Sequence, residues 1–175
     1  MNLLNLYLLG GLIAHKAVWE LMKRRQPAGP RTRQAAQPVK TTVVKAIKVA
    51  ILLGIVVQTL LPPVFPISVA NPEQLRWIGA AIYTAGLVIA ILGRVQLGDN
   101  WLDIEEAGTR REQAVVSNGI YGFIRHPIYT GDLLLLIGLE LALESWLVLG
   151  VLLLAPVVLM QAVREESFLR ESLPG

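Results

Sequence analysis

Five apolar segments alternate with polar ones along the chain. They cover residues 3–22, 43–61, 75–97, 128–143 and 146–163. A helix needs about 20 apolar residues to cross a hydrocarbon core of about 30 Å, and the first segment has that length. Only Glu144 and Ser145 separate the last two segments, so these are predicted to form an antiparallel helical hairpin. The pattern therefore predicts an all-α integral membrane bundle of about five transmembrane helices, the last two a tight hairpin.

The order of the segments divides the chain at residue 94. Residues 1–93 carry the first three predicted helices and a basic loop at 23–48. Residues 94–175 carry a polar segment, the hairpin at 128–163 and a C-terminal segment. Gly138 and Gly150 lie in opposite arms of the hairpin, and small side chains let membrane helices approach closely. We therefore expect these two glycines to allow close helix approach.

Composition makes lipid the main solvent of this chain. Of its 175 residues, 54% are hydrophobic and 17% are charged, and the mean hydropathy is +0.54. A soluble domain of this size has too much surface for its volume to hide so much apolar area. There is no cysteine, which excludes disulfides and thiolate zinc sites.

The cations are placed unevenly, and their placement predicts an orientation. Eight Lys or Arg residues and no acidic residue lie between positions 23 and 48. Basic loops between spans stay in the cytoplasm. The N-terminus and residues 62–74 are therefore predicted outside, and residues 98–127 and the tail from Arg164 inside. A nucleic-acid-binding arm is the alternative for a basic run, but apolar segments flank this one on both sides. We expect a lipid bilayer, and no nucleic acid, as the partner.

A dense polar stretch, GIYGFIRHPIYTGD at 119–132, stands directly before the fourth apolar segment. An anchor at the lipid headgroups accounts for Arg125 and Tyr129. It does not account for Asp132, because a carboxylate inside a span is costly and usually faces the protein interior or a wet cavity. The hairpin returns the chain to the same side of the membrane. This stretch and the polar residues at 161–171 are therefore predicted to meet at the cytoplasmic end of the bundle.

Signatures of soluble nucleotide sites and of metal sites are missing from the sequence. There is no G-x-G-x-x-G after a strand, no P-loop and no H-E-x-x-H. The stretch LGDNWLDIEEAG holds four carboxylates, but their spacing is not that of a calcium loop. We therefore expect no metal site.

Three motifs occur in the order found in a known family. They are RVQLGDNW at 94–101, QAVVSNGIYGFIRHPIYTG at 113–131 and EESFL at 165–169. With them the chain resembles the isoprenylcysteine carboxyl methyltransferases and the related phospholipid methyltransferases, which work within membranes. The resemblance covers residues 94–175. It implies a methyltransferase that binds S-adenosylmethionine from the cytosol without a Rossmann domain and receives a lipophilic acceptor sideways from the bilayer.

The resemblance also assigns roles to individual positions. It implies an aromatic side of the cofactor site, which suits adenine and a sulfonium cation. It implies an acidic side at Glu165, which can pair with the ammonium of the cofactor's methionine end. The implied cofactor-binding residues are Gln113, Ala114, Val115, Val116, Tyr121, His126, Pro127, Ile128, Tyr129 and Glu165. The implied catalytic residues are Arg125 and Arg164, and the implied acceptor-contacting residues are Asn100, Trp101, Gln161 and Arg164.

Several acceptors are compatible with these motifs. In the prenylcysteine enzymes an Arg four residues before the pocket Glu is thought to hold the substrate carboxylate. Here that position is Gln161, with Arg164 one helical turn away. We favour carboxyl O-methylation of an isoprenylcysteine-like acceptor, with N-methylation of a phospholipid amine as the alternative. An NADPH-dependent sterol-reductase-like protein is a further alternative, although it would need cations where this segment is rich in acids. The last alternative is a membrane protein that is not an enzyme.

Overall fold

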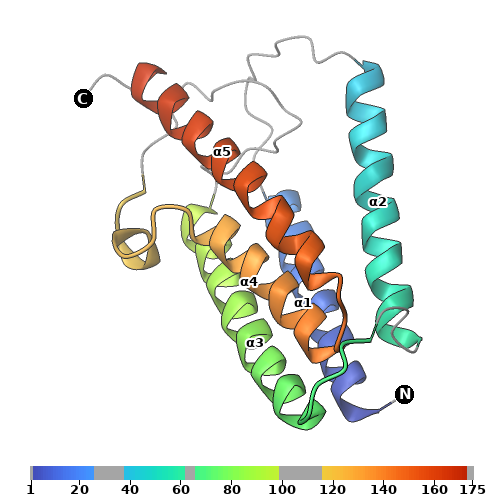
Figure 1. Cartoon of the computed structure of the whole chain (residues 1–175). Helices are drawn as coiled ribbons and strands as arrows, with labels where there is room; N and C mark the ends of the chain where they lie inside the picture. The colour runs from blue at the N-terminus through green and yellow to red at the C-terminus, as the bar shows by residue number, and fades with distance from the viewer. Residues whose placement is uncertain (1, 26–37, 62–65, 99–115, 173–175) are drawn as a thin grey trace.

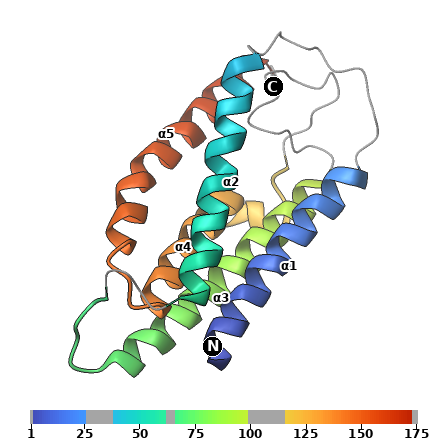
Figure 2. The ribbon, with the colours of Figure 1, turned by 90° about the vertical axis from the view of Figure 1, so that its right-hand side faces the viewer.

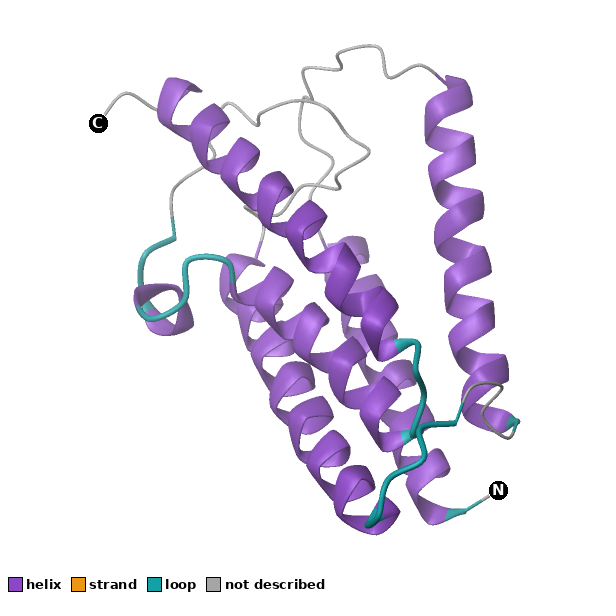
Figure 3. Cartoon of the chain, in the orientation of Figure 1, coloured by secondary structure: helices purple, strands orange, loops and turns teal. Residues whose placement is uncertain are grey.

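The computed structural model describes residues 2–25, 38–61, 66–98 and 116–172. The side chains of residues 38–45, 47–48, 164–165 and 168–172 are outside this description. Every regular element in the described ranges is a helix (Figures 1 and 3), which confirms the predicted all-α class. The elements are α1 (Leu3–Arg25), α2 (Pro38–Leu60), α3 (Pro72–Leu97), the short 3-10 helix η2 (Gly119–Gly122), α4 (Pro127–Ala142) and α5 (Val148–Ser172).

α3 and α4 pack with their backbones in direct contact and form the centre of the bundle (Figure 1). Gly79, Gly86 and Gly93 recur at every seventh position of α3 and face α4. A Cβ atom at Gly86 would lie 2.7 Å from the carbonyl oxygen of Gly131, so a larger side chain does not fit. On α4, Gly131 and Gly138 are also seven residues apart and face α3. A seven-residue repeat keeps small residues on one helix face, and close packing of this kind is typical of membrane helices.

α1 docks on this pair of helices through one buried tyrosine. Tyr83 of α3 is fully buried, and its hydroxyl donates a hydrogen bond of 2.6 Å to the carbonyl oxygen of Leu8. Leu8 and Leu12 of α1 pack with Leu135 and Leu139 of α4 in one apolar cluster around it. α1 therefore lies beside α3, as Figure 2 shows.

α2 stands apart from α3 and α4 in Figure 1 and is tied to the bundle near its C-terminal end. The Asn5 side-chain amide donates to the carbonyl oxygen of Thr59 at 2.8 Å. The Gln58 side-chain amide donates to the carboxylate of Glu140 on α4 at 2.6 Å. Glu140 is 4% exposed, and a buried carboxylate needs such a donor.

α4 and α5 run antiparallel, joined by the short connection at residues 143–147. Glu144 turns the chain with φ 54, and its carbonyl oxygen accepts a hydrogen bond of 2.6 Å from the Ile67 backbone. Its carboxylate also pairs with Arg76 at 2.9 Å. The close helix approach predicted at Gly138 is confirmed, with α3 as the neighbour. The one predicted at Gly150 was wrong, because a Cβ atom there would meet nothing within 4 Å.

By length and composition, fewer of the described helices qualify as membrane spans than the five that the sequence predicts. In the described part of the chain, one helix, Pro72–Leu97, is by itself long and apolar enough to cross a bilayer. The apolar stretches Val49–Leu60 and Val148–Val163 are shorter. α4 has 16 residues, below the roughly 20 that span a bilayer untilted, and α1 carries His15, Lys16 and Glu20 within its predicted span. The five-span arrangement stays a prediction.

Candidate functional site

Four elements converge at one end of the bundle: the C-terminal end of α3, η2, the start of α4 and the C-terminal half of α5 (Figure 1). An ion pair of 2.9 Å joins Arg125, in the loop before α4, to Glu166 on α5. The pair links the two polar segments that the hairpin was predicted to bring together. Because the Arg125 side chain is 78% exposed, the pair itself contributes little stability.

η2 is fastened to α3 by two hydrogen bonds. Gly119 has φ 59, a left-handed conformation that glycine adopts without strain, and it lets the chain turn sharply into η2. The Gln96 side-chain oxygen then accepts a bond of 2.7 Å from the Ile120 backbone. The Tyr121 hydroxyl donates to the carbonyl oxygen of Gly93 at 3.2 Å. Tyr121 is thereby held at the end of α3.

α4 begins at His126 and Pro127, with Pro127 in the first helical turn, where its missing N–H is not needed. Pro127 is buried. A Cβ atom at Gly93 would lie 3.0 Å from Pro127 Cγ and 3.2 Å from Ile128 Cγ1. Because Gly93 has no side chain, the start of α4 packs directly on it. Its carbonyl oxygen accepts the hydrogen bond from Tyr121. The rings of His126 and Tyr129 lie 6.0 Å apart, and both residues are half-buried.

The remaining predicted residues divide into three groups. Gln113, Ala114, Val115, Asn100 and Trp101 lie outside the described residues. Arg164 and Glu165 belong to α5, but their side chains are not described. Val116 and Gln161 are both half-buried. Of the predicted cofactor-binding residues, the structure describes the side chains of Val116, Tyr121, His126, Pro127, Ile128 and Tyr129. The roles given to all of the predicted residues stay predictions.

A second polar cluster adjoins this site, and the sequence did not reveal it. Asp132 of α4 lies 3.0 Å from Nε2 of His15 on α1. The His15 ring stacks on Trp19 at 4.7 Å between centroids, and the guanidinium of Arg94 lies 5.8 Å from the Trp19 centroid. Arg94 is fully buried and donates to the carbonyl oxygen of Gly98 at 2.9 Å. The available signal was the i,i+4 spacing of His15 and Trp19 on one helix face.

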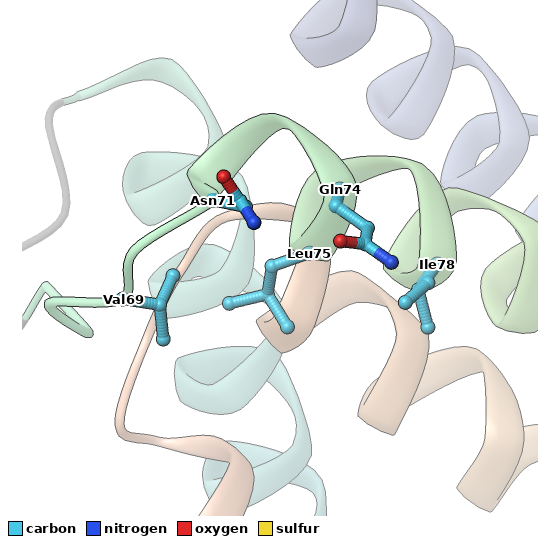
Figure 4. Close-up of a pocket in the computed structure, with 5 residues that line it drawn as sticks. All are labelled: Val69, Asn71, Gln74, Leu75 and Ile78. Atoms are coloured by element: carbon cyan, nitrogen blue, oxygen red, sulfur yellow. The ribbon is translucent and has the colours of Figure 1, made fainter.

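A shallow hollow elsewhere on the molecule is separate from this site (Figure 4). It is lined by Val69, Asn71, Gln74, Leu75 and Ile78. These residues precede α3 or lie in its first turns. Tyr121 and the start of α4 instead contact Gly93, which lies near the C-terminal end of α3. Ile78 and Gly93 are separated by about 22 Å along the helix axis, at roughly 1.5 Å per residue. The hollow is too far away to belong to the converging elements.

The described side chains fit the aromatic side of an S-adenosylmethionine site. Tyr121, His126 and Tyr129 come from η2 and from the boundary and first turn of α4. Aromatic faces suit both adenine and a sulfonium cation. Among the described residues, no group of three or more His, Cys, Asp or Glu side chains could hold a metal ion.

A protein family and individual known proteins match this chain. The model of the phospholipid methyltransferase family matches residues 75–174. The cobalt-zinc-cadmium resistance protein CzcN of Cupriavidus metallidurans is 33% identical over 100 residues, which cover 56% of this chain and 45% of that protein. The protein-S-isoprenylcysteine O-methyltransferase of Dictyostelium discoideum is 31% identical over 58 residues, covering 33% of this chain and 24% of that protein.

The chain thus spans less than half the length of either relative. No solved structure matches it. The family match nevertheless covers more than half of this chain, and it contains nearly all of α3 and the whole of η2, α4 and α5. The chain belongs to the phospholipid methyltransferase family.

Proposed function

We propose that the protein is a membrane-embedded methyltransferase that uses S-adenosylmethionine and acts on a lipophilic acceptor. One observation carries the proposal: the family match at residues 75–174 contains every predicted cofactor residue. The described members of that set converge at one end of the bundle, where Gly93 contacts both Tyr121 and Pro127.

The proposed cofactor site has an aromatic and an acidic side. Tyr121, His126 and Tyr129 would hold the adenine and sulfonium portions, and Glu165 would hold the ammonium. The bound cofactor supplies a methyl group on a sulfonium centre. Methyl transfer gains mainly from alignment and from exclusion of water. The contacts of η2 and α4 with α3 support that role, because they set the aromatic side in place before any ligand binds.

The exposed apolar surface supports a bilayer around the bundle. On α5, Leu153 is 78% exposed, Leu159 61% and Val163 60%. Contiguous apolar surface of this kind marks membrane or protein contact. α1 ends in Lys23, Arg24 and Arg25, at the same end of the bundle as the end of α3 (Figure 2). The positive-inside rule then supports a site that faces the cytoplasm and an N-terminus outside.

Two acceptor classes remain candidates, and different observations favour them. A carboxylate, as in an isoprenylcysteine, is favoured by the relative named protein-S-isoprenylcysteine O-methyltransferase. A lone pair on the acceptor's carboxylate oxygen would form the new O–CH₃ bond. The S–CH₃ bond of the cofactor would break at the same time, with the electron pair of that bond staying on sulfur. No base is needed. An amine headgroup is favoured by the carboxylate and imidazole of Asp132 and His15, because an ammonium must lose a proton before it can attack.

Calorimetry on the purified protein in lipid nanodiscs tests the proposal. We expect wild type to bind S-adenosylmethionine and not NADPH. Tyr121→Ala should weaken binding about tenfold, the scale of one lost aromatic contact and hydrogen bond. Phe123→Ala is the matched control, since Phe123 lies in the same segment and is 91% exposed. Binding of NADPH, or equal affinities for all three proteins, would contradict the proposed site.

A further inference from the structure

His15 and Asp132 form a partly exposed polar pair between α1 and α4. Asp132 Oδ1 lies 3.0 Å from His15 Nε2, and the two side chains are 41% and 21% exposed. The pair joins α1 to α4 across 117 positions of the chain. α1 lies outside the family match at residues 75–174. The pair is therefore contributed in part by a segment that the family resemblance does not describe.

Docking of α1 does not depend on this pair. Tyr83 and the apolar residues Leu8 and Leu12 already hold α1 on α3 and α4. A partly exposed ion pair adds little stability, whereas a carboxylate within an apolar bundle is costly. A structural role thus explains the pair poorly, and its partial exposure leaves it accessible to a ligand.

The pair lies on the side of α4 that carries predicted cofactor residues. Asp132 follows Tyr129 by three positions and Ile128 by four, and side chains at these spacings share a helix face. Asp132 is about 6 Å farther along the helix axis than Ile128, at roughly 1.5 Å per residue. An acceptor that enters from the bilayer and reaches toward the cytoplasmic end would pass this position on its way to the cofactor.

A series of contacts through Trp19 and Arg94 links His15 to the residues of the proposed cofactor site. Trp19 stacks on His15 and lies under Arg94. Arg94 is adjacent in sequence to Gly93, which contacts Tyr121 and Pro127. The imidazole is therefore oriented on one side by a carboxylate and on another by an indole ring.

We propose that His15, oriented by Asp132, accepts the proton that an ammonium acceptor loses before methyl transfer. An ionised carboxylate only accepts hydrogen bonds, so Nε2–H donates to Asp132 and Nδ1 remains the basic nitrogen. One N–H bond of the acceptor breaks, its electron pair stays on nitrogen as the nucleophile, and one N–H bond forms at Nδ1. Asp132 stabilises the resulting imidazolium and keeps its own charge throughout. The negative charge of Asp132 also repels a carboxylate acceptor.

The inference rests on the proposed methyltransferase function and is tested with labelled S-adenosylmethionine in nanodiscs. The probes are phosphatidylethanolamine, as the amine, and N-acetyl-farnesylcysteine, as the carboxylate. We expect transfer to the amine, and His15→Gln should slow the single-turnover rate about 100-fold or more, the scale of general base catalysis. Its cofactor affinity should stay within about twofold of wild type, because the substitution leaves the aromatic side of the cofactor site unchanged. Asp132→Asn should slow the same step, and imidazole should partly restore the rate of His15→Ala.

Glu20→Gln is the matched control on the same helix, because Glu20 forms a local ion pair with Arg24, one turn away, at 3.4 Å. It should retain the wild-type rate. Transfer to the carboxylate alone, or a wild-type rate in His15→Gln, overturns the role of the pair and leaves the methyltransferase function intact. Loss of cofactor affinity in both His15→Gln and Asp132→Asn, without imidazole rescue, assigns the pair a structural role and also overturns the proposal. Transfer to neither probe, together with no cofactor binding by wild type, contradicts the proposed function itself.

Discussion

One added methyl group at Gly138 should force apart the two helices that carry the site. A Cβ atom there would lie 2.6 Å from the Tyr83 Cα atom and 2.7 Å from the Gly79 carbonyl oxygen. Carbon atoms pack at about 3.5–4.0 Å, so α3 and α4 would have to separate by about 1 Å. Both opposing atoms belong to the backbone, and no change of rotamer relieves the overlap. Overpacking of this kind costs about 1–3 kcal/mol.

Gly150→Ala is the control, because a Cβ atom at Gly150 meets nothing within 4 Å. Alanine gains up to about 1 kcal/mol over glycine in a helix, so this variant should be neutral or slightly more stable than wild type. We expect the free energy of unfolding in mixed micelles, followed by circular dichroism, to differ between the two variants by about 1–4 kcal/mol. Gly138→Ala should also bind cofactor more weakly. Equal stability of Gly138→Ala and Gly150→Ala would refute the close packing of α3 on α4.

Three further predictions concern the site and the topology. His126→Ala should weaken cofactor binding in calorimetry while circular dichroism shows unchanged helix content, since His126 precedes α4; wild-type affinity would remove it from the site. Glu165→Gln should weaken cofactor binding by about 1.5–3 kcal/mol, the scale of a hydrogen bond to a charged group. Glu166→Gln breaks an exposed pair with Arg125 and should weaken cofactor binding by only about 0–1 kcal/mol. Equal affinities in the two variants would leave Glu165 and Glu166 as solvated helix-end residues. A single cysteine at position 34 should react with an impermeant reagent only from the cytoplasmic side, and labelling from outside would reverse the topology.

The sequence predicted the helices well because their signals are local. Apolar segments longer than a strand, interrupted by prolines and charges, mark the helices directly. The short link at Glu144 and Ser145 predicted the reversal between α4 and α5. Boundaries shifted modestly: α5 begins at Val148 rather than Trp146, because the turn extends to residue 147 before regular helix begins.

The sequence could not show which helix faces which. Gly138 was predicted to allow close helix approach, and the structure shows that it packs on α3. A small residue indicates close approach without identifying the neighbour. The cost of burying Asp132 was recognised, and its partner was not. His15 lies 117 positions away, and no periodicity within one segment reports a pairing at that separation.

Methyl transfer by the purified protein in a bilayer tests the central claim most directly. The full chain in nanodiscs would be incubated with S-adenosylmethionine labelled in its methyl group and with amine-headgroup and prenylcysteine lipids, and the organic phase would be extracted. Label in one lipid product, abolished or strongly reduced by Tyr121→Ala but not by Phe123→Ala, is the result that a membrane methyltransferase with its cofactor site at η2 and α4 predicts. Cofactor binding that is absent in calorimetry, together with no label in any lipid, would contradict it.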